Sequence, residues 1–258
     1  MGAADDLRGD FQAAMAGAST ALAAADRLCL ACVTLLHVDG AAVSVSEGTD
    51  STYGTFGSSD ELSRRLDEYQ FTFGEGPCLD AVRLDEPVLV ADLDDSAEVR
   101  WSAFREATLG EGVRAVFAFP VSLDAAPVGA LDLYCQAPGP LTGDRLAGGL
   151  LAARLATDPL VALLRSDSWT DGELAEPEGQ PRWTQLASLQ RVEVYQATGM
   201  IVGAFDVDPA EALVLLRAQA YIRGVMASEL ALDVVERRVL LDDAWRDGAD
   251  RQEGGGGE

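Results

Sequence analysis

The residues best suited to chemistry in this sequence are its thiols and its one imidazole. The cysteines are Cys29, Cys32, Cys78 and Cys135. Cys29 and Cys32 form a CxxC pair, but there is no second such pair and only one histidine, so a zinc site would have too few ligands. We therefore expect no bound metal and no cofactor. We interpret the cysteines as buried thiols of a protein in a reducing compartment.

Two further features could bind a ligand. His37 lies in the apolar run 33–38. We predict a structural residue of a strand there, with a ligand or haem contact as the alternative. The Gly74-Glu75-Gly76 sequence precedes Pro77 without the Lys-Ser/Thr pair of a phosphate-binding loop, so these glycines are expected to permit a turn.

The charge balance limits the partners of the chain. Acidic residues number 43 against 19 basic ones, every basic residue is arginine, and the net charge is −24. This charge repels nucleic acids and anionic membranes over most of the surface, so nucleic-acid binding needs a local group of arginines. The acidic N-terminus differs from a secretory signal, and no apolar run approaches the roughly 20 residues of a membrane span. We predict a cytoplasmic protein.

The first part of the chain has the pattern of an α+β domain, predicted at 1–165. Short apolar runs indicate strands of an antiparallel sheet, and longer periodic segments indicate helices that flank it. An Asp39-Gly40 step between two apolar runs predicts a hairpin. The expected strands are 32–38, 42–46, 87–93, 113–121 and 128–135, and the expected helices are 8–28, 59–69, 97–110 and 141–165.

The rest of the chain is predicted to hold a linker at 166–182, three helices at 183–243 and a disordered Gly-rich tail at 244–258. The first helix should run from about 183 to 205. Asp208 and Pro209 should begin the second helix and Gly224 should end it, while Ser228 can cap the third. The long first helix has apolar residues on more than one face, which predicts a homodimer.

The first domain resembles a GAF domain over about 10–165. The resemblance is carried by residues 73–81 (FGEGPCLDA), 101–104 (WSAF), 113–120 (VRAVFAFP) and 129–133 (GALDL). It implies a sensory fold that binds an unidentified small molecule or serves for dimerisation. Some GAF proteins reduce oxidised methionine with cysteines, but a nucleophilic thiol needs a neighbour that lowers its pKa, and none is visible beside Cys78.

The segment 183–243 resembles the ANTAR family of RNA-binding antitermination domains. The resemblance is carried by residues 197–201 (ATGMI), by 211–212 (EA), 215–217 (LLR) and Ala220, and by 230–231 (LA) with 234–235 (VV). Helical periodicity does not require Gly199, since Gly inside a helix costs about 1 kcal/mol relative to Ala. The resemblance implies binding to paired stem-loop RNA, usually as a dimer.

The residues expected to contact RNA are Arg217, Tyr221 and Arg223, with Thr198, Gly199 and Ser228 on the same surface. The alternatives are a solvated surface for the arginines and a core position for Tyr221. The segment 183–243 carries five arginines against nine carboxylates, a net charge of −4, so its arginines must gather on one face.

Three functions remain open at this point. The first is a signal-responsive transcription antitermination regulator that binds stem-loop RNA and is gated by the GAF-like domain, without enzymatic activity. The second is a ligand-binding or dimerising scaffold without RNA affinity, which the acidic balance favours. The third is a thiol-dependent GAF-fold reductase, which depends on the cysteines alone.

Overall fold

The computed structural model describes residues 3–46, 53–124, 126–165, 191–242 and 245. The predicted linker at 166–182, and the predicted tail apart from Trp245, lie outside the described residues. The chain divides into two compact units, residues 1–70 with 75–190 and residues 71–74 with 191–258. We call them the N-terminal unit and the C-terminal unit. None of the helices within the described ranges combines the length and the apolar character that a membrane span requires.

The N-terminal unit is built on a five-stranded sheet with the strand order β2-β1-β5-β4-β3. Every pairing in this sheet is antiparallel. The predicted α+β class, an antiparallel sheet flanked by helices, is confirmed. The strands are β1 (Gly40–Ser46), β2 (Tyr53–Ser58), β3 (Val88–Val90), β4 (Ala115–Leu123) and β5 (Ala126–Cys135).

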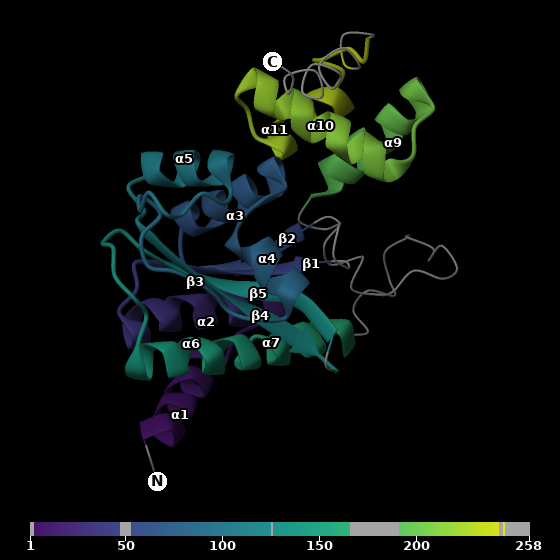
Figure 1. The fold of residues 1–258 in the computed structure, drawn as a ribbon. Coiled ribbons are helices and arrows are strands. Elements are labelled where there is room, and N and C mark those ends of the chain that lie inside the picture. Colours follow the sequence, from purple (N-terminus) through teal and green to yellow (C-terminus); the bar gives the residue numbers. More distant parts are fainter. Residues whose placement is uncertain (1–2, 47–52, 125, 166–190, 243–244, 246–258) are drawn as a thin grey trace. The chain divides into compact units, whose positions relative to one another are not determined.

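Helices cover both faces of this sheet (Figure 1). On one face lie α2 (Ala21–Leu36), α6 (Gly143–Leu155) and α7 (Thr157–Arg165), with α1 (Ala3–Met15) packed against α2 and α6. On the other face lie α3 (Glu61–Phe73), α4 (Pro77–Leu84) and α5 (Ser102–Gly110).

The main hydrophobic core lies between the sheet and α2, α6 and α7. Side chains alternate between the two faces of a strand, so Val43, Phe117 and Leu131 all point into this core. Gly149 lets α6 approach closely, because a Cβ atom there would lie 2.7 Å from the ring of Phe119. This face of the sheet is packed almost wholly with apolar side chains.

The predicted helix at 8–28 is wrong, because the chain forms two helices there. It breaks after Met15, where Gly17 adopts a positive φ of 70°. The hydroxyl of Thr20 then accepts a hydrogen bond from the Ala23 amide at 3.1 Å and caps α2. The expected helix at 141–165 likewise divides into α6 and α7.

The predicted strand at 32–38 and the hairpin at Asp39-Gly40 are also wrong. Helix α2 continues to Leu36 because Leu28, Cys32 and Leu36, four residues apart, bury one face against the sheet. His37 is the exposed C-cap of α2 with φ 52°, so it is not a strand residue. The amide of Asp39 donates to the Tyr134 carbonyl at 2.9 Å, which starts β1 beside β5.

The C-terminal unit contains α9 (Val192–Phe205), α10 (Pro209–Arg223) and α11 (Ala227–Val235), and each of the three packs against the other two. Its core combines Ile201 of α9, Leu216 of α10 and Leu230 of α11, all buried. The predicted start of α10 is confirmed: the Asp208 side chain accepts a hydrogen bond from the Glu211 amide at 2.8 Å, and Pro209 follows. Gly224 ends α10 in the left-handed conformation, as predicted.

One prediction for this unit is tested only in part, and another needs correction. Within the described residues the first helix begins at Val192, and 183–190 lie outside them. Ser228 does not cap the third helix, because α11 begins at Ala227 with Met226 as the N-cap residue. The Met226 amide donates a hydrogen bond to the carboxylate of Glu229 at 3.3 Å, so Glu229 provides a side-chain hydrogen bond at the start of α11.

Candidate ligand-binding site

The sheet face toward α3, α4 and α5 carries polar side chains. Strand alternation places Ser44 of β1 and Asp132 of β5 on this face, opposite to their apolar neighbours Val43 and Leu131. Tyr134 lies two residues beyond Asp132 on the same face. A polar row inside a packed layer needs partners, because an unsatisfied buried polar group is costly.

Asp67 supplies a first set of these partners. This buried residue of α3 accepts a hydrogen bond from the hydroxyl of Ser44 and another from the hydroxyl of Thr55, the latter at 2.5 Å. The two hydroxyls come from adjacent strands, β1 and β2. Asp67 therefore ties α3 to both strands.

Gln70, one turn further along α3, supplies the second set. Its Nε2 donates to Oδ2 of Asp132 at 2.6 Å, and its Oε1 accepts from the Cys78 amide at 2.7 Å. Gly76 makes room for it: the residue has φ 148°, and a Cβ atom there would lie 2.4 Å from Oε1 of Gln70. The glycine before Pro77 thus permits a turn, as expected, and also admits the Gln70 side chain.

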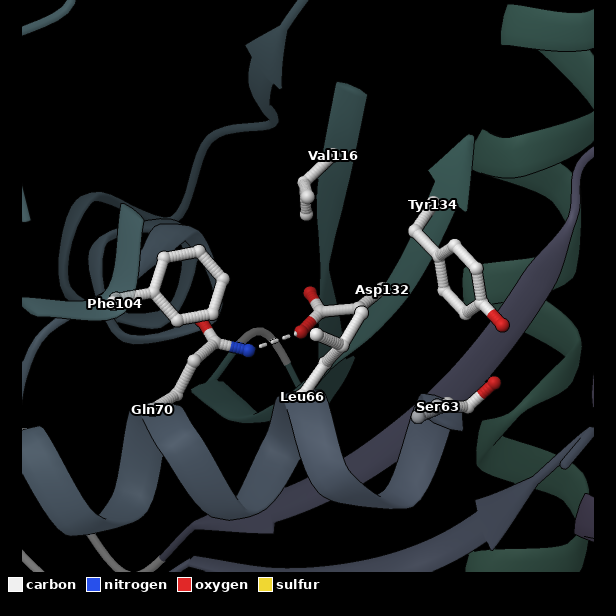
Figure 2. A pocket seen from close by; sticks show the side chains of 8 residues that line it. Ser63, Leu66, Gln70, Phe104, Val116, Asp132 and Tyr134 are labelled. Carbon is white, nitrogen blue, oxygen red and sulfur yellow. Dashed lines mark hydrogen bonds between the residues drawn. The ribbon is translucent and has the colours of Figure 1, made fainter. Parts of the chain in front are cut away.

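A small cavity lies between this network and α5 (Figure 2). Its volume is about 10 Å³, which is the space one water molecule needs. Asp132 is partly open to the cavity, and its buried Oδ1 has no hydrogen-bond partner among the described residues. Figure 2 shows this oxygen pointing away from Gln70. The cavity is lined by Ala42, Ser63, Leu66, Gln70, Phe104, Val116, Asp132 and Tyr134.

The environment of Asp132 favours its neutral form. Burial raises the pKa of Asp132 to about 7; the hydrogen bond from Gln70 lowers the pKa, and the negative charge of Asp67 raises it. The carboxyl therefore changes its charge near neutral pH. It can donate a hydrogen bond below that pH and accept one above it.

The thiols of the unit are held in their protonated forms. Burial, followed by the charges of Asp132 and Asp67, raises the pKa of Cys78 well above its usual value. Burial likewise raises the pKa of Cys29, Cys32 and Cys135. Since the thiolate is the nucleophile, this environment disfavours thiol chemistry at Cys78.

Helix α5 forms one wall of the cavity through Phe104, and two side chains of the FGEGPCLDA segment hold it there. Oε1 of Glu75 accepts hydrogen bonds from the amides of Ala103 and Phe104, at 2.7 and 3.1 Å, at the N-terminus of α5. The indole of Trp101 donates to Oδ2 of Asp80 at 3.0 Å. These residues position the wall and do not line the cavity.

A family model described as a GAF domain matches residues 18–157, 140 of the 258 residues. The chain belongs to the GAF domain family. GAF domains are typically sensory or ligand-binding regulatory domains. A cavity beside a polar network in the N-terminal unit is consistent with a domain of this kind. The GAF resemblance seen in the sequence is confirmed, whereas the ANTAR resemblance stays a prediction.

Three solved structures are similar to this chain at low sequence identity. The GAF domain of a phosphoenolpyruvate-protein phosphotransferase from Coxiella burnetii is 15% identical with a TM-score of 0.50, covering 62% of this chain and 93% of its own. The corresponding domain from Acinetobacter is 11% identical with a TM-score of 0.49, covering 63% and 95%. Free methionine-R-sulfoxide reductase from Neisseria meningitidis is 12% identical with a TM-score of 0.47, covering 62% and 89%. The comparison with curated proteins gave no match.

The residues predicted to bind RNA all lie in the C-terminal unit, outside the GAF domain. Tyr221 and Arg223 are exposed near the end of α10, and Arg217 is half-buried one turn before Tyr221. Thr198 and Gly199 lie in α9, where the Thr198 hydroxyl donates to the Val194 carbonyl at 2.7 Å. Ser228, in the first turn of α11, accepts a hydrogen bond from Arg191 at 3.3 Å.

The arginines of the C-terminal unit have different surroundings. Arg238 pairs with Asp233 at 2.6 Å and also with Glu236, so its charge is locally neutralised. The guanidinium of Arg223 lies 5.7 Å from the ring centroid of Trp245. The two arginines of α10, Arg217 and Arg223, are six residues apart. A helix turns by about 240° over six residues, so these two arginines do not lie on one face of α10 as expected.

Proposed function

We propose that the protein is a signal-responsive, non-enzymatic transcription antitermination regulator of the cytoplasm. In this proposal the GAF domain binds a small molecule, and the C-terminal unit binds stem-loop RNA in a manner set by that ligand. The observation that carries the RNA role is the spacing of Arg217 and Tyr221. They lie four residues apart and therefore on one face of α10.

Tyr221 supports this role because it is not a core aromatic in the C-terminal unit. Its side chain is 56% exposed. Exposed aromatic rings stack on unpaired bases, and a neighbouring arginine adds a cation for phosphate or a base edge. This is the combination that an RNA loop needs.

Gly199 gives independent support. It lies on the exposed surface of α9, and a Cβ atom there would meet nothing within 4 Å. Packing among the described residues therefore gives no reason for a glycine, although Gly costs a helix about 1 kcal/mol relative to Ala. A partner backbone that approaches α9 closely would explain it.

Electrophoretic mobility shift titrations with a two-loop terminator RNA test the proposal. Arg217→Ala and Tyr221→Ala should each weaken binding by about tenfold, a loss of 1–3 kcal/mol for a base or phosphate contact. Arg238→Ala is the matched control, because Asp233 and Glu236 already neutralise that arginine, and it should leave binding unchanged. Affinity should fall steeply with added salt.

The acidic balance supports one competing function, a ligand-binding or dimerising scaffold without RNA affinity. Absence of a salt-sensitive shift, or a shift that Arg217→Ala leaves unchanged, would reject the RNA role in favour of that scaffold. The proposed homodimer is tested separately by sedimentation equilibrium. A monomer mass at micromolar concentration would exclude it.

A further inference from the structure

The cavity beside Asp132 has a property that its fold class does not determine: a buried hydrogen-bond acceptor, Oδ1 of Asp132, lies beside it. Oδ2 of Asp132 is satisfied by Gln70, whereas the buried Oδ1 has no partner within the described residues. Leaving a buried polar atom unsatisfied costs about 1–3 kcal/mol. When Asp132 is ionised, the site is therefore completed by a group that donates a hydrogen bond to Oδ1.

The local charge favours a cationic donor over a neutral one. Asp67 of α3 places a second carboxyl against this face of the sheet, close enough to act on both Asp132 and Cys78. Asp132 itself forms no ion pair with any described arginine. Charges in a low-dielectric site interact more strongly than in water, and the net charge of −24 attracts cations from solution.

The remaining lining indicates what the cation should carry. Leu66, Phe104 and Val116 contribute apolar surface to the lining of this cavity (Figure 2). An ammonium group is attracted to an aromatic ring face, and an apolar stem would be desolvated against the two aliphatic side chains. A cavity of about 10 Å³ holds only one water, so a larger ligand must displace the Phe104 wall.

We infer that the GAF cavity binds a small organic cation, a primary ammonium on an apolar or aromatic stem, with Oδ1 of Asp132 as the acceptor and Phe104 as the wall that opens. This names the ligand class of the sensory site in the proposed function and rests on that function for its biological meaning. The titratable group whose charge acts on Asp132 is Asp67 from α3, and Tyr134 lines the cavity from β5.

Calorimetric titration of the full chain with benzylamine tests this inference, with benzyl alcohol and benzoate as matched neutral and anionic probes. A ligand of this size should reach a dissociation constant of about 1 mM. Because the ammonium needs an ionised Asp132, benzylamine affinity should rise about tenfold from about pH 6 to about pH 8. Benzyl alcohol should bind more weakly, and benzoate should not bind.

Asp132→Asn should reduce benzylamine affinity by about tenfold or more, since the amide has no charge. Asp67→Asn is the matched control: it removes a charge from the same sheet face, but Asp67 bonds to Ser44 and Thr55 and does not line the cavity. It should weaken binding less. Phe104→Leu, which keeps the wall apolar but removes the ring, should weaken benzylamine binding by a few-fold.

Equal binding of benzyl alcohol, equal losses in Asp132→Asn and Asp67→Asn, or no benzylamine binding at ten times the expected dissociation constant would each overturn the inference. In the last two cases a bound water, rather than an organic cation, would donate the hydrogen bond to Oδ1 of Asp132. The RNA titration gives an independent readout. Benzylamine binding without an RNA shift would reject the RNA role and retain the ligand class, and the reverse result would reject the ligand class alone.

Discussion

The two faces of the sheet in the GAF domain carry side chains of different polarity. Toward α2, α6 and α7, β1, β4 and β5 present apolar side chains such as Val43, Phe117 and Leu131. Toward α3, α4 and α5, β1 and β5 present Ser44 and Asp132. One face gains free energy from the removal of apolar surface from water.

On the other side of the sheet lie the carboxyls of Asp67 and Asp132, and their removal from water costs free energy. Asp67 is compensated by two hydroxyls, but Asp132 keeps an unpartnered oxygen and a pKa raised to about 7. Perturbed carboxyls in a cavity occur more often at functional sites than in structural cores. The contrast between the faces thus separates the residues that stabilise this domain from those available for binding.

The largest effect should come from the apolar face. Phe119→Ala removes a fully buried ring that contacts α6 at Gly149, which should lower the free energy of unfolding by about 3–5 kcal/mol. Urea titration followed by tryptophan fluorescence measures this loss. Val99→Ala, at an exposed site, is the control and should change stability by less than about 0.5 kcal/mol. A loss below about 1 kcal/mol in Phe119→Ala would contradict the assignment of this face as the core.

A smaller effect of opposite sign is expected on the polar face. The folded protein holds the Asp132 proton up to about pH 7, whereas the unfolded chain releases it near the ordinary value of about 4. Between these values the folded state binds more protons, so stability falls as pH rises. Asp132→Asn removes this term and should be more stable than the native chain at pH 8, by on the order of 2 kcal/mol, and not at pH 4.

Urea unfolding of both proteins across about pH 4–8 measures this difference. Asp85→Asn, which makes the same replacement at an exposed carboxyl, serves as the control. If the difference between Asp132→Asn and the native chain were independent of pH, Asp132 would titrate normally. The contrast between the faces would then lose its electrostatic part.

The sequence predicted the apolar face far better than the polar one. Strands at 113–121 and 128–135 were recognisable because apolar residues dominate both, and the structure places β4 and β5 there. The predicted strand at 32–38 is wrong because the apolar and β-branched residues of this run suit a buried helix as well as a strand. Only the contacts of Leu28, Cys32 and Leu36 with the sheet decide for the helix.

The polar network was not predicted, since its members come from distant parts of the chain. Gln70 and Asp132 are 62 positions apart and meet only through the packing of α3 on β5. One signal was present: Asp132 stands between Leu131 and Leu133 in the expected strand 128–135, which places a carboxyl on the sheet face opposite to these leucines. In the C-terminal unit, by contrast, the Asp208 and Gly224 signals are local and were read correctly.

The smallest effect on stability is expected when a buried cysteine is replaced by alanine, and this replacement should leave binding unchanged. Cys78 on the polar face and Cys32 on the apolar face are both fully buried with a raised pKa, and each should behave as a small apolar side chain. Cys78→Ala and Cys32→Ala should each cost about 1 kcal/mol of stability in urea titrations. Both variants should leave benzylamine binding and RNA binding unchanged. If Cys78→Ala alone abolished either activity without a matching loss of stability, a chemical role for this thiol would replace the structural one, and the polar face would be a reaction site rather than a binding site.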